Sequence, residues 1–375
     1  MKILHTEASA GWGGQELRIL AEMQVLRERG HQLELAAPGS APVHREAAAL
    51  GFACHDVPIA RKSLRGLLAL RHLLGRVRFD LINTHSSTDA WLAALACATI
   101  GAAPPIVRTR HISAPVPRNA ASRWLFDRAS AAIVTTGEKL RRELIEVNGF
   151  RRVPIVSVPT GIDPQRFAPG NARDERSRLA LAPAFTIGIV ATLRSWKGHR
   201  FLIAALGQLA AEGDHATQLL IVGDGPQHAA LQEQVAAAGL SARVRFTGHE
   251  PQPERWLRAL DVFVLPSYAN EGVPQALMQA MMSALPCVTC DVGAIGEIAR
   301  DGETAIMVPT QDAAALAAAL LRLREDPPLR AKLGANARAF ALAHCTLAAM
   351  GDAMESVFNS ALAADRRSKT QPQSA

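Results

Sequence analysis

Short runs of apolar and β-branched residues recur along the chain, separated by stretches in which apolar residues repeat at helical spacing. Many of these runs carry no charge on either face, which is typical of parallel strands covered on both sides. Strands that alternate with helices of ten or more residues predict a doubly wound α/β architecture. The predicted strands lie at residues 2–6, 32–37, 52–57, 80–85, 105–111, 131–136, 154–159, 185–191, 218–223, 244–246, 261–267, 286–290 and 305–309.

A stretch rich in proline, glycine and charge interrupts this alternation near residues 159–185. We therefore expect two domains, residues 1–165 and 166–345, each built on its own parallel sheet. Residues 346–364 repeat apolar positions at helical spacing, and we expect this helix to return to the first domain. The polar remainder, residues 365–375, is predicted to be a disordered tail.

Cysteine usage and the apolar stretches bear on the cellular compartment. Five cysteines, with no second pair beside Cys287 and Cys290, argue against a disulfide framework or a metal site and favour a reducing, cytoplasmic compartment.

The N-terminal apolar run is too short for a secretory signal. Residues 90–107 and 272–290 approach the length of a membrane span, but glycine and proline break each into a helix followed by a strand. We therefore expect no transmembrane helix.

Positive charge is concentrated in the first half of the chain. Residues 1–160 contain 21 Lys and Arg against 13 Asp and Glu, a net charge of +8, whereas residues 161–375 contain 20 against 21, a net charge of −1. This asymmetry suggests a polyanionic partner, either nucleic acid or anionic lipid headgroups, and a merely soluble surface is the alternative. Aromatic residues make up 5% of the chain and we find no nucleic-acid motif, so we expect no nucleic-acid partner.

Two basic segments suit an anionic membrane surface. Residues 60–80 repeat Arg or Lys through a leucine-rich helical run, and residues 116–130 place Trp124 and Phe126 among three arginines. Each segment fits docking on anionic lipid. The alternative for both segments is packing in the fold, which in the first segment means a helix that packs its leucines on the sheet.

Ligands of doubly wound sheets bind beyond the carboxyl ends of the strands, so the loop after each strand is a candidate site. After the first strand, a loop containing Gly11, Gly13 and Gly14 leads into a helix and would let a phosphate approach the backbone. The loop matches neither the dinucleotide-binding fingerprint nor the P-loop. The sequence therefore gives little support to a nicotinamide or ATP site.

Two loops of the second half carry charged residues suited to a sugar diphosphate. Arg194 and Lys197 lie at a helix entrance, where two cations and the helix dipole can meet a diphosphate, although solvated charges are the alternative. Glu271 can accept hydrogen bonds from sugar hydroxyls. The alternative is that Glu271 is an acid of a helix's first turn, where the helix dipole stabilises its charge, with Asn270 as the N-cap. We find no D-x-D, H-E-x-x-H or G-x-S-x-G motif, so we expect neither a metal nor a serine triad.

Eight segments in order resemble the retaining glycosyltransferases of family 4, which have the GT-B fold. These segments are residues 13–35, 79–86, 159–167, 190–203, 219–226, 244–249, 261–298 and 301–309. The resemblance covers almost the whole chain. It implies two Rossmann-like domains facing across a cleft, with the acceptor on the N-terminal domain and a nucleotide-diphosphate sugar mainly on the C-terminal domain.

The resemblance also implies roles for single residues. Arg194 and Lys197 match the basic pair that grips the donor diphosphate. Glu271, followed by Gly272, matches the first acid of the family's E-x7-E motif, which contacts the donor sugar. His111 matches a histidine near the reacting centre in many members, and a satisfied histidine at a strand end is the alternative.

The resemblance also implies the remaining contacts with the donor, and one residue, Gln279, departs from the family pattern. Gly13 and Gly14 match the glycine loop that faces the donor phosphates, and backbone around Gly248 is implied in base recognition. Gln279 stands where the family's second acid accepts hydrogen bonds from the nucleotide ribose. A glutamine keeps a carbonyl acceptor without charge assistance, which roughly halves the strength of the bond. We therefore expect weaker donor affinity rather than lost activity.

We thus expect a metal-independent retaining glycosyltransferase that needs no cofactor. Its acceptor would be a glycan or a lipid-linked molecule of lipopolysaccharide or other cell-envelope polysaccharide synthesis, reached from the cytoplasm or from the inner face of the membrane. Retention would proceed by same-face attack, with the leaving phosphate accepting the acceptor's proton. Two alternatives stay open: a non-catalytic sugar-nucleotide-binding protein, suggested by Gln279, and a sugar-nucleotide epimerase.

Overall fold

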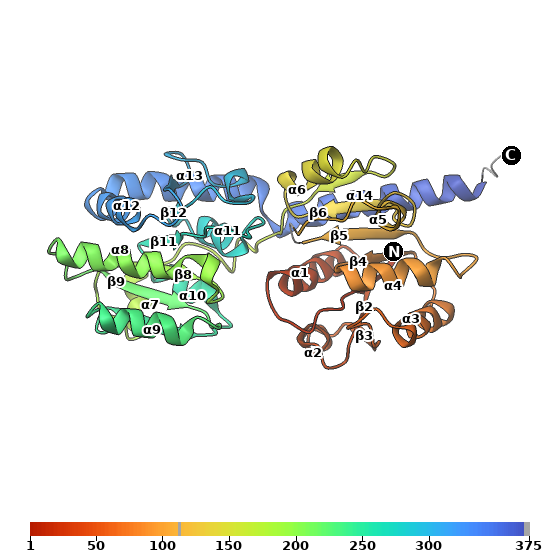
Figure 1. Cartoon of the computed structure of the whole chain (residues 1–375), viewed down its shortest axis with the longest axis horizontal. Coiled ribbons are helices and arrows are strands. Elements are labelled where there is room, and N and C mark those ends of the chain that lie inside the picture. The colour runs from red at the N-terminus through yellow and green to blue at the C-terminus, as the bar shows by residue number, and fades with distance from the viewer. Residues whose placement is uncertain (112–113, 371–375) are drawn as a thin grey trace. The chain divides into compact units, whose positions relative to one another are not determined.

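The computed structural model describes residues 1–111 and 114–370, which form two compact units (Figure 1). The first unit contains Met1–Gly161 and helix α14 (Leu347–Thr370), and the second contains Ile162–Thr346. The sequence placed the corresponding breaks after residues 165 and 345. The chain therefore leaves the first unit and returns to it for its last helix.

Seven parallel strands form the sheet of the first unit, in the order β3-β2-β1-β4-β5-β6-β7. Their bounds are β1 (Lys2–Thr6), β2 (Gln32–Ala37), β3 (Ala53–Asp56), β4 (Leu81–Thr84), β5 (Ile106–Arg110), β6 (Ala132–Thr135) and β7 (Ile155–Ser157). Every residue of β4, β5 and β6 is buried, as expected for strands covered on both faces. Each strand lies within a predicted run, and the parallel α/β prediction is confirmed.

Helices cover both faces of this sheet. They are α1 (Gly14–Glu28), α2 (Pro42–Ala49), α3 (Leu64–Arg76), α4 (Ser87–Cys97), α5 (Ala120–Asp127), α6 (Glu138–Arg142), which continues as the π-helical turn η1 (Glu143–Val147), and α14. One apolar core contains Met23 of α1, Val43 of α2 and Phe358 of α14. A second core contains Leu70 of α3 and Ala93 of α4. Because successive residues of β1, β4 and β6 enter different cores, the two cores lie on opposite faces of the sheet.

Helix α14 completes the first unit, where it lies beside the sheet (Figure 1). Met354 and Phe358 are fully buried in the same core as α1. The helix continues past its last buried residue, Ala361, because no glycine or proline stops it. Residues 365–370 are therefore helical, which corrects the predicted disordered tail; the rest of that prediction, residues 371–375, lies outside the described residues.

Six parallel strands form the sheet of the second unit, in the order β10-β9-β8-β11-β12-β13. The strands are β8 (Thr186–Val190), β9 (Gln218–Val222), β10 (Val244–Gly248), β11 (Val262–Leu265), β12 (Cys287–Thr289) and β13 (Ile306–Met307). The helical segments are α7 (Ala172–Arg178), η2 (Ser195–Lys197), α8 (His199–Ala211), α9 (His228–Ala237), α10 (Pro253–Arg258), α11 (Gln275–Met282), η3 (Ile295–Glu297), α12 (Ala313–Glu325) and α13 (Pro327–His344). Met278, Met281 and Met282 of α11 are buried in the core, so they are packing residues.

Each sheet reverses its strand order once, between β1 and β4 in the first unit and between β8 and β11 in the second. Ligands of open α/β sheets bind outside the carboxyl ends of the strands at such a switch point. The loops after β1, β4, β8 and β11 are therefore where chemistry is expected.

Two further expectations concern cysteines and membrane spans. All five cysteines are free, so Cys287 and Cys290 form no disulfide. Within residues 1–111 and 114–370, no helix has both the length and the apolar character needed to cross a bilayer.

Candidate active site

Lys197 and Glu271 form an ion pair at the carboxyl edge of the second sheet. Lys197 Nζ lies 2.6 Å from Oε1 of Glu271, and Ser267 Oγ donates a hydrogen bond of 2.6 Å to the same oxygen. Lys197 follows β8 and Glu271 follows β11, the neighbouring strands at the switch point. The structure thus brings together two candidate residues that are far apart in the sequence.

The Glu271 side chain is only 5% exposed, whereas that of Lys197 is 20% exposed. Burying a carboxylate is costly unless it is paired and hydrogen-bonded, and Lys197 and Ser267 meet that requirement. Both groups act on Oε1. The carboxylate is therefore held in one orientation before any ligand binds.

The backbone around Glu271 is unusual on both sides. Asn270 adopts a left-handed conformation with φ of +56°, and a Cβ at Gly293, whose φ is +63°, would overlap the carbonyl oxygen of Glu271. Helix α11 begins only at Gln275, with Pro274 as its N-cap. The alternative interpretation is therefore wrong, because Asn270 does not cap the helix and Glu271 does not lie in its first turn, where the dipole acts.

Arg194 is the N-cap of the short helix η2 and Lys197 is its last residue, shortly before α8. Gly198, with φ of +79°, joins the two helices, and a Cβ there would overlap the carbonyl oxygen of Pro266. The exposed Arg194 guanidinium lies 5.7 Å from the centre of the Trp196 ring. Both cations therefore stand at the amino end of α8, where the helix dipole favours anions.

The remaining candidates of the second unit lie near the same edge. Gly272 directly follows Glu271, and Gln279 is a half-buried residue of α11. Gly248 ends β10 with φ of +75°, and its carbonyl oxygen accepts a hydrogen bond of 2.9 Å from the backbone N–H of Gly223. Gly248 thus lies at the end of its strand, Gly272 lies in the loop after β11, and Gln279 lies within α11.

Gly13 and Gly14 belong to the first unit. Gly13 is the N-cap of α1, with extended backbone, and Gly14 is the first residue of that helix. Backbone N–H groups at such a helix start are suited to an anion.

Glu7, which the sequence analysis did not predict, organises the loop before these glycines. This fully buried side chain accepts a hydrogen bond of 2.6 Å from the backbone N–H of Ser9 and another from Gln15 Nε2. Burial, together with the nearby charge of Asp89, raises the pKa of Glu7 to about 8. The loop after β1 is thus hydrogen-bonded to the Glu7 carboxyl group, which keeps its proton near neutral pH.

Three histidines form a hydrogen-bonded chain at the carboxyl edge of the first sheet. His5 Nδ1 lies 2.9 Å from His85 Nε2, and His85 Nδ1 lies 3.0 Å from His111 Nε2. His5 belongs to β1, His85 follows β4, and His111 follows β5. His111 is thus a strand-end histidine whose Nε2 is satisfied by His85, as the alternative interpretation expects.

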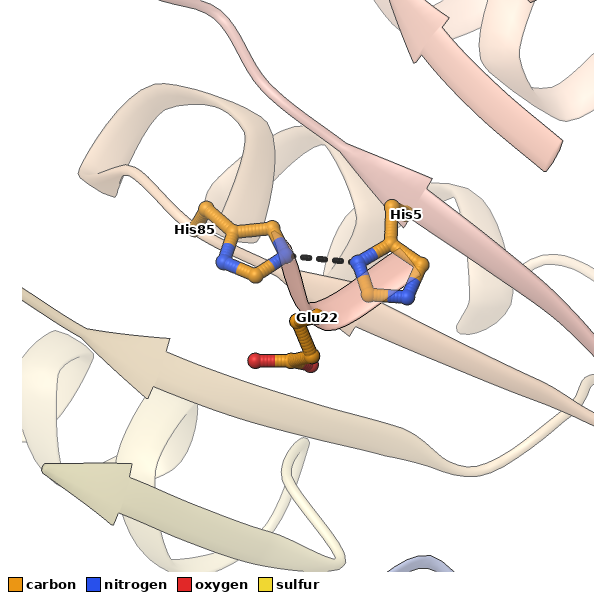
Figure 2. Close-up of side chains that lie close together, drawn as sticks. All are labelled: His5, Glu22 and His85. Atoms are coloured by element: carbon orange, nitrogen blue, oxygen red, sulfur yellow. Dashed lines mark hydrogen bonds between the residues drawn. The ribbon is translucent and has the colours of Figure 1, made fainter. Parts of the chain in front are cut away.

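A buried polar network lies beside His5 and His85. Glu22 of α1 accepts a hydrogen bond of 2.8 Å from Asn83 Nδ2 through its Oε1, and its Oε2 lies 3.6 Å from Nε of Arg18. Figure 2 shows Glu22 beside the His5–His85 pair. Neither His5 Nε2 nor Glu22 Oε2 has a hydrogen-bond partner within the described part of the chain.

His5, Glu22 and His85 each place one nitrogen or oxygen atom within 4.8 Å of the others, a spacing that a metal ion could use. Both ring nitrogens of His85 are, however, engaged with other histidines. The Arg18 guanidinium would also place a positive charge beside the ion. The network therefore suits a hydrogen-bonded cluster better than a metal site.

Comparison with known families agrees with this geometry. The model described as "Glycosyltransferase Family 4" matches residues 12–166, and the model described as "Glycosyl transferases group 1" matches residues 184–326. The chain belongs to the family 4 glycosyltransferases. The two matches fall on the two units in turn.

Curated relatives of this glycosyltransferase act in different settings. This chain is 30% identical over 250 residues to the lipopolysaccharide core biosynthesis mannosyltransferase LpcC of Rhizobium leguminosarum. The match covers 65% of this chain and 68% of the relative. The glycosyltransferase is also 30% identical over 298 residues to the D-inositol 3-phosphate glycosyltransferase of Nocardia farcinica, covering 71% of this chain. That match spans 64% of the relative, just under two thirds of its length.

Solved structures show the same fold. The glycosyltransferase superposes on the Anabaena protein Alr3699/HepE, solved in complex with UDP, with a TM-score of 0.85 and 20% identity, covering 96% of this chain and 100% of that one. At this identity the likeness concerns the fold alone. The predicted GT-B fold, with two parallel-sheet α/β domains, is thereby confirmed.

Proposed function

We propose that this glycosyltransferase moves a sugar, with retention of configuration, from a nucleotide-diphosphate donor to a glycan or lipid-linked acceptor of the cell envelope. The observation that carries the proposal is the Lys197–Glu271 ion pair at the switch point of the second sheet. A cation suited to a diphosphate and a carboxylate suited to sugar hydroxyls are held there in contact. The second unit would therefore bind the donor, and the first unit would bind the acceptor.

The arrangement suits departure of a nucleoside diphosphate. Breaking the bond between the sugar and the diphosphate builds negative charge on the leaving group. Arg194, Lys197 and the amino end of α8 offer two cations and a helix dipole that are in place before the reaction. Such preorganised charge lowers the barrier without a rearrangement at the moment of bond cleavage.

Glu271 is better suited to bind the sugar than to attack it. Lys197 and Ser267 both hold its Oε1, so its charge is already partly neutralised. A carboxylate in that state is a weak nucleophile but remains an acceptor for sugar hydroxyls. This supports same-face attack, with the leaving phosphate accepting the acceptor's proton, over a covalent sugar intermediate.

The curated relatives guide the choice of acceptor. The Rhizobium relative is described as a lipopolysaccharide core biosynthesis mannosyltransferase, and on this likeness we propose a lipopolysaccharide or related cell-envelope glycan as the acceptor. The Anabaena structure contains UDP, which makes UDP the first nucleotide to test. Gln279 would contact the ribose with one carbonyl acceptor, so the affinity for nucleotide would be modest.

We also propose that α3 contacts an anionic membrane from the cytoplasmic side. Leu64 is 70% exposed and Leu68 is 54% exposed. One turn apart on α3, they lie near the exposed cations Arg61, Lys62 and Arg65. Exposed leucines flanked by cations match the surface of an interfacial helix.

Packing within the first unit accounts for the other apolar residues of the two basic segments, 60–80 and 116–130. Leu70 and Leu74 of α3 are buried in the core. In the second segment, Phe126 is buried and the Trp124 ring stacks on Trp91 at 5.9 Å. We therefore restrict the proposed membrane contact to the amino-terminal half of α3.

A transfer assay with purified full-length protein tests the proposed function. UDP-, GDP-, ADP- and CMP-sugars would be offered with a lipopolysaccharide core acceptor, and both sugar transfer and free nucleotide would be measured. Transfer from one donor with retained anomeric configuration is expected. Binding of nucleotide without turnover would favour the non-catalytic alternative, and conversion of the donor sugar without an acceptor would favour an epimerase.

A further inference from the structure

Two buried arginines lie on one face of β5, near the carboxyl end of the strand. Arg108 is 4% exposed and Arg110 is 9% exposed. Residues two apart on a strand share a face, and Arg108 contacts Phe126 of α5, so this is the face that α5 covers. Within the described residues, neither guanidinium forms an ion pair. Burying two cations in this way is costly unless another group compensates their charge.

Three buried donor groups at this place lack a hydrogen-bond acceptor. Nη1 of Arg108, Nε of Arg110 and Oγ1 of Thr84 have no hydrogen-bond partner in the part of the chain that the structure describes. Thr84 is fully buried at the end of β4 and pairs in register with Arg108, so its side chain shares the face of the two arginines. Buried polar groups in folded proteins are nearly always paired. These three donors therefore require an acceptor that the described residues do not supply.

The neighbouring side chains compensate the two arginines only in part. The Arg108 guanidinium stacks on the Phe126 ring at 4.2 Å, a cation–π contact that offsets a fraction of the cost of burial. Asp89 and Glu143 favour the charged arginines electrostatically without pairing with them. Both oxygens of Asp89 already accept hydrogen bonds from other groups. The unpaired donors are thus left without a carboxylate of their own.

The charge and the number of these donors suit a phosphate. Burial, followed by the nearby charge of Arg110, lowers the pKa of Arg108 to about 10, so its guanidinium is still charged at neutral pH. A planar carboxylate is matched by two parallel donors of one guanidinium, whereas here three side chains each offer a separate donor. A phosphate monoester carries close to two negative charges and three acceptor oxygens. Two cations and a hydroxyl therefore match a phosphate better than a carboxylate.

We propose that Arg108, Arg110 and Thr84 form an anion site of the first unit that binds a phosphate group of the acceptor. The identity of the ligand rests on the proposed function, in which this unit binds the acceptor, but the anion site itself does not. Its residues differ from those proposed for the donor diphosphate, because Arg194 and Lys197 belong to the second unit. The first unit would thereby select phosphorylated acceptors over unphosphorylated ones.

Nitrogen NMR of full-length protein labelled in its arginine side chains tests the anion site without a sugar substrate. Inorganic phosphate is titrated in, with chloride at equal ionic strength as the reference. We expect the Nε resonance of Arg110 to shift until the site is saturated. Arg108→Met should weaken this binding about tenfold, the effect of one lost charge-assisted hydrogen bond, whereas Arg123→Met, at an exposed position of α5, should leave it unchanged. An Arg110 resonance that does not respond to phosphate would overturn the proposal.

Thermal unfolding distinguishes an anion site from a purely structural pair of arginines. Without phosphate, Arg108→Met should unfold at a temperature at least as high as the native protein, because it removes a buried charge that has no partner. Phosphate should stabilise the native protein more than Arg108→Met, since a ligand stabilises the fold it binds. Thr84→Val keeps both cations and the shape of the side chain, and it should weaken phosphate binding about fivefold. Equal stabilisation of the native protein and both variants by phosphate would contradict the site.

Transfer to an acceptor with and without its phosphate tests the identity of the ligand. Phosphatase treatment of a phosphate-bearing core acceptor should raise its KM about tenfold with little change in kcat, and Arg110→Met should abolish the difference. Equal KM values for the two acceptors in the native protein would overturn the assignment of the phosphate to the acceptor. Absence of transfer to either acceptor would count against the proposed function alone. In that case the Arg110 resonance would still decide whether the anion site exists.

Discussion

Gly293 lies against the backbone of Glu271 so closely that any side chain at position 293 would overlap the Glu271 carbonyl oxygen. The backbone of Gly293 also has a φ of +63°, which glycine adopts without strain. The position of the buried carboxylate thus depends on a glycine 22 residues further along the chain. That dependence gives the first prediction.

Gly293→Ala should displace Glu271 and lower kcat/KM by at least tenfold, with a loss of about 1–3 kcal/mol in the free energy of unfolding. Chemical denaturation and the transfer assay measure the two effects. Gly302→Ala is the matched control, because Gly302 has a φ of +69° but open space around its Cβ position. Gly302→Ala should lose stability through backbone strain but keep its activity. Equal activity in the two variants would contradict the role of the contact between Gly293 and Glu271.

Lys197→Met should lower kcat/KM by about 100-fold, since a preorganised cation at the leaving group contributes on that scale. Removing one partner from a buried pair also destabilises the fold, so activity needs a structural control. Arg324→Met breaks a comparable pair, in which Arg324 lies 2.5 Å from the buried Asp214 at the opposite edge of the second sheet. If both variants lost activity in proportion to stability, the catalytic interpretation of Lys197 would fail.

Leu64→Glu with Leu68→Glu should release the protein from vesicles that contain anionic lipid. Each change replaces an exposed leucine by a charge that anionic headgroups repel. Separate removal of Arg61, Lys62 or Arg65 should weaken binding about fivefold for each cation, in a salt-dependent way. Vesicle sedimentation measures the bound fraction.

Leu342→Glu serves as the control for this prediction, because Leu342 is an exposed leucine of α13 in the second unit. It should bind vesicles as the native protein does. Equal binding to neutral and anionic vesicles would contradict the proposed electrostatic contact.

The contribution of Glu7 to stability should fall as pH rises from the ordinary pKa of 4.5 towards the folded pKa of about 8. Over this window the unfolded chain loses the Glu7 proton while the folded protein keeps it, so the unfolded state is favoured increasingly. The slope from this group is at most about 1.4 kcal/mol per pH unit, and it vanishes above the folded pKa. Urea unfolding across the window measures it.

Glu7→Gln should remove this component of the slope, because the amide does not titrate. Glu28→Gln, at an exposed position of α1, provides the comparison. An identical slope in the native protein and in Glu7→Gln would mean that Glu7 is ionised in the fold.

The sheets were predictable from the sequence because their strands are apolar on both faces. Runs such as 131–136 and 261–267 contain the observed β6 and β11, and no other element type suits short uncharged β-branched runs between helices. The start of α11 was harder to place. Pro274 occupies its N-cap, so the helix begins after the proline rather than beside Glu271.

The candidate site was predictable only as far as charges at strand ends. Lys197 and Glu271 could each be identified from the strand before it, but their contact could not, because it depends on how β8 and β11 pair. Glu7 and Glu22 were missed for a similar reason. Nothing in the local sequence distinguishes a buried acid on a helix or loop from an exposed one, since its partners come from distant segments.

The return of α14 to the first unit affects the order in which the protein can fold. Met354 and Phe358 close a core that also contains Ile3, so that core combines residues that precede the second unit along the chain with residues that follow it. The second unit, Ile162–Thr346, is contiguous and is fully synthesised before α14 exists. Domains generally fold as units during synthesis, N-terminal ones first. Here the half that is synthesised first must be the last to finish folding.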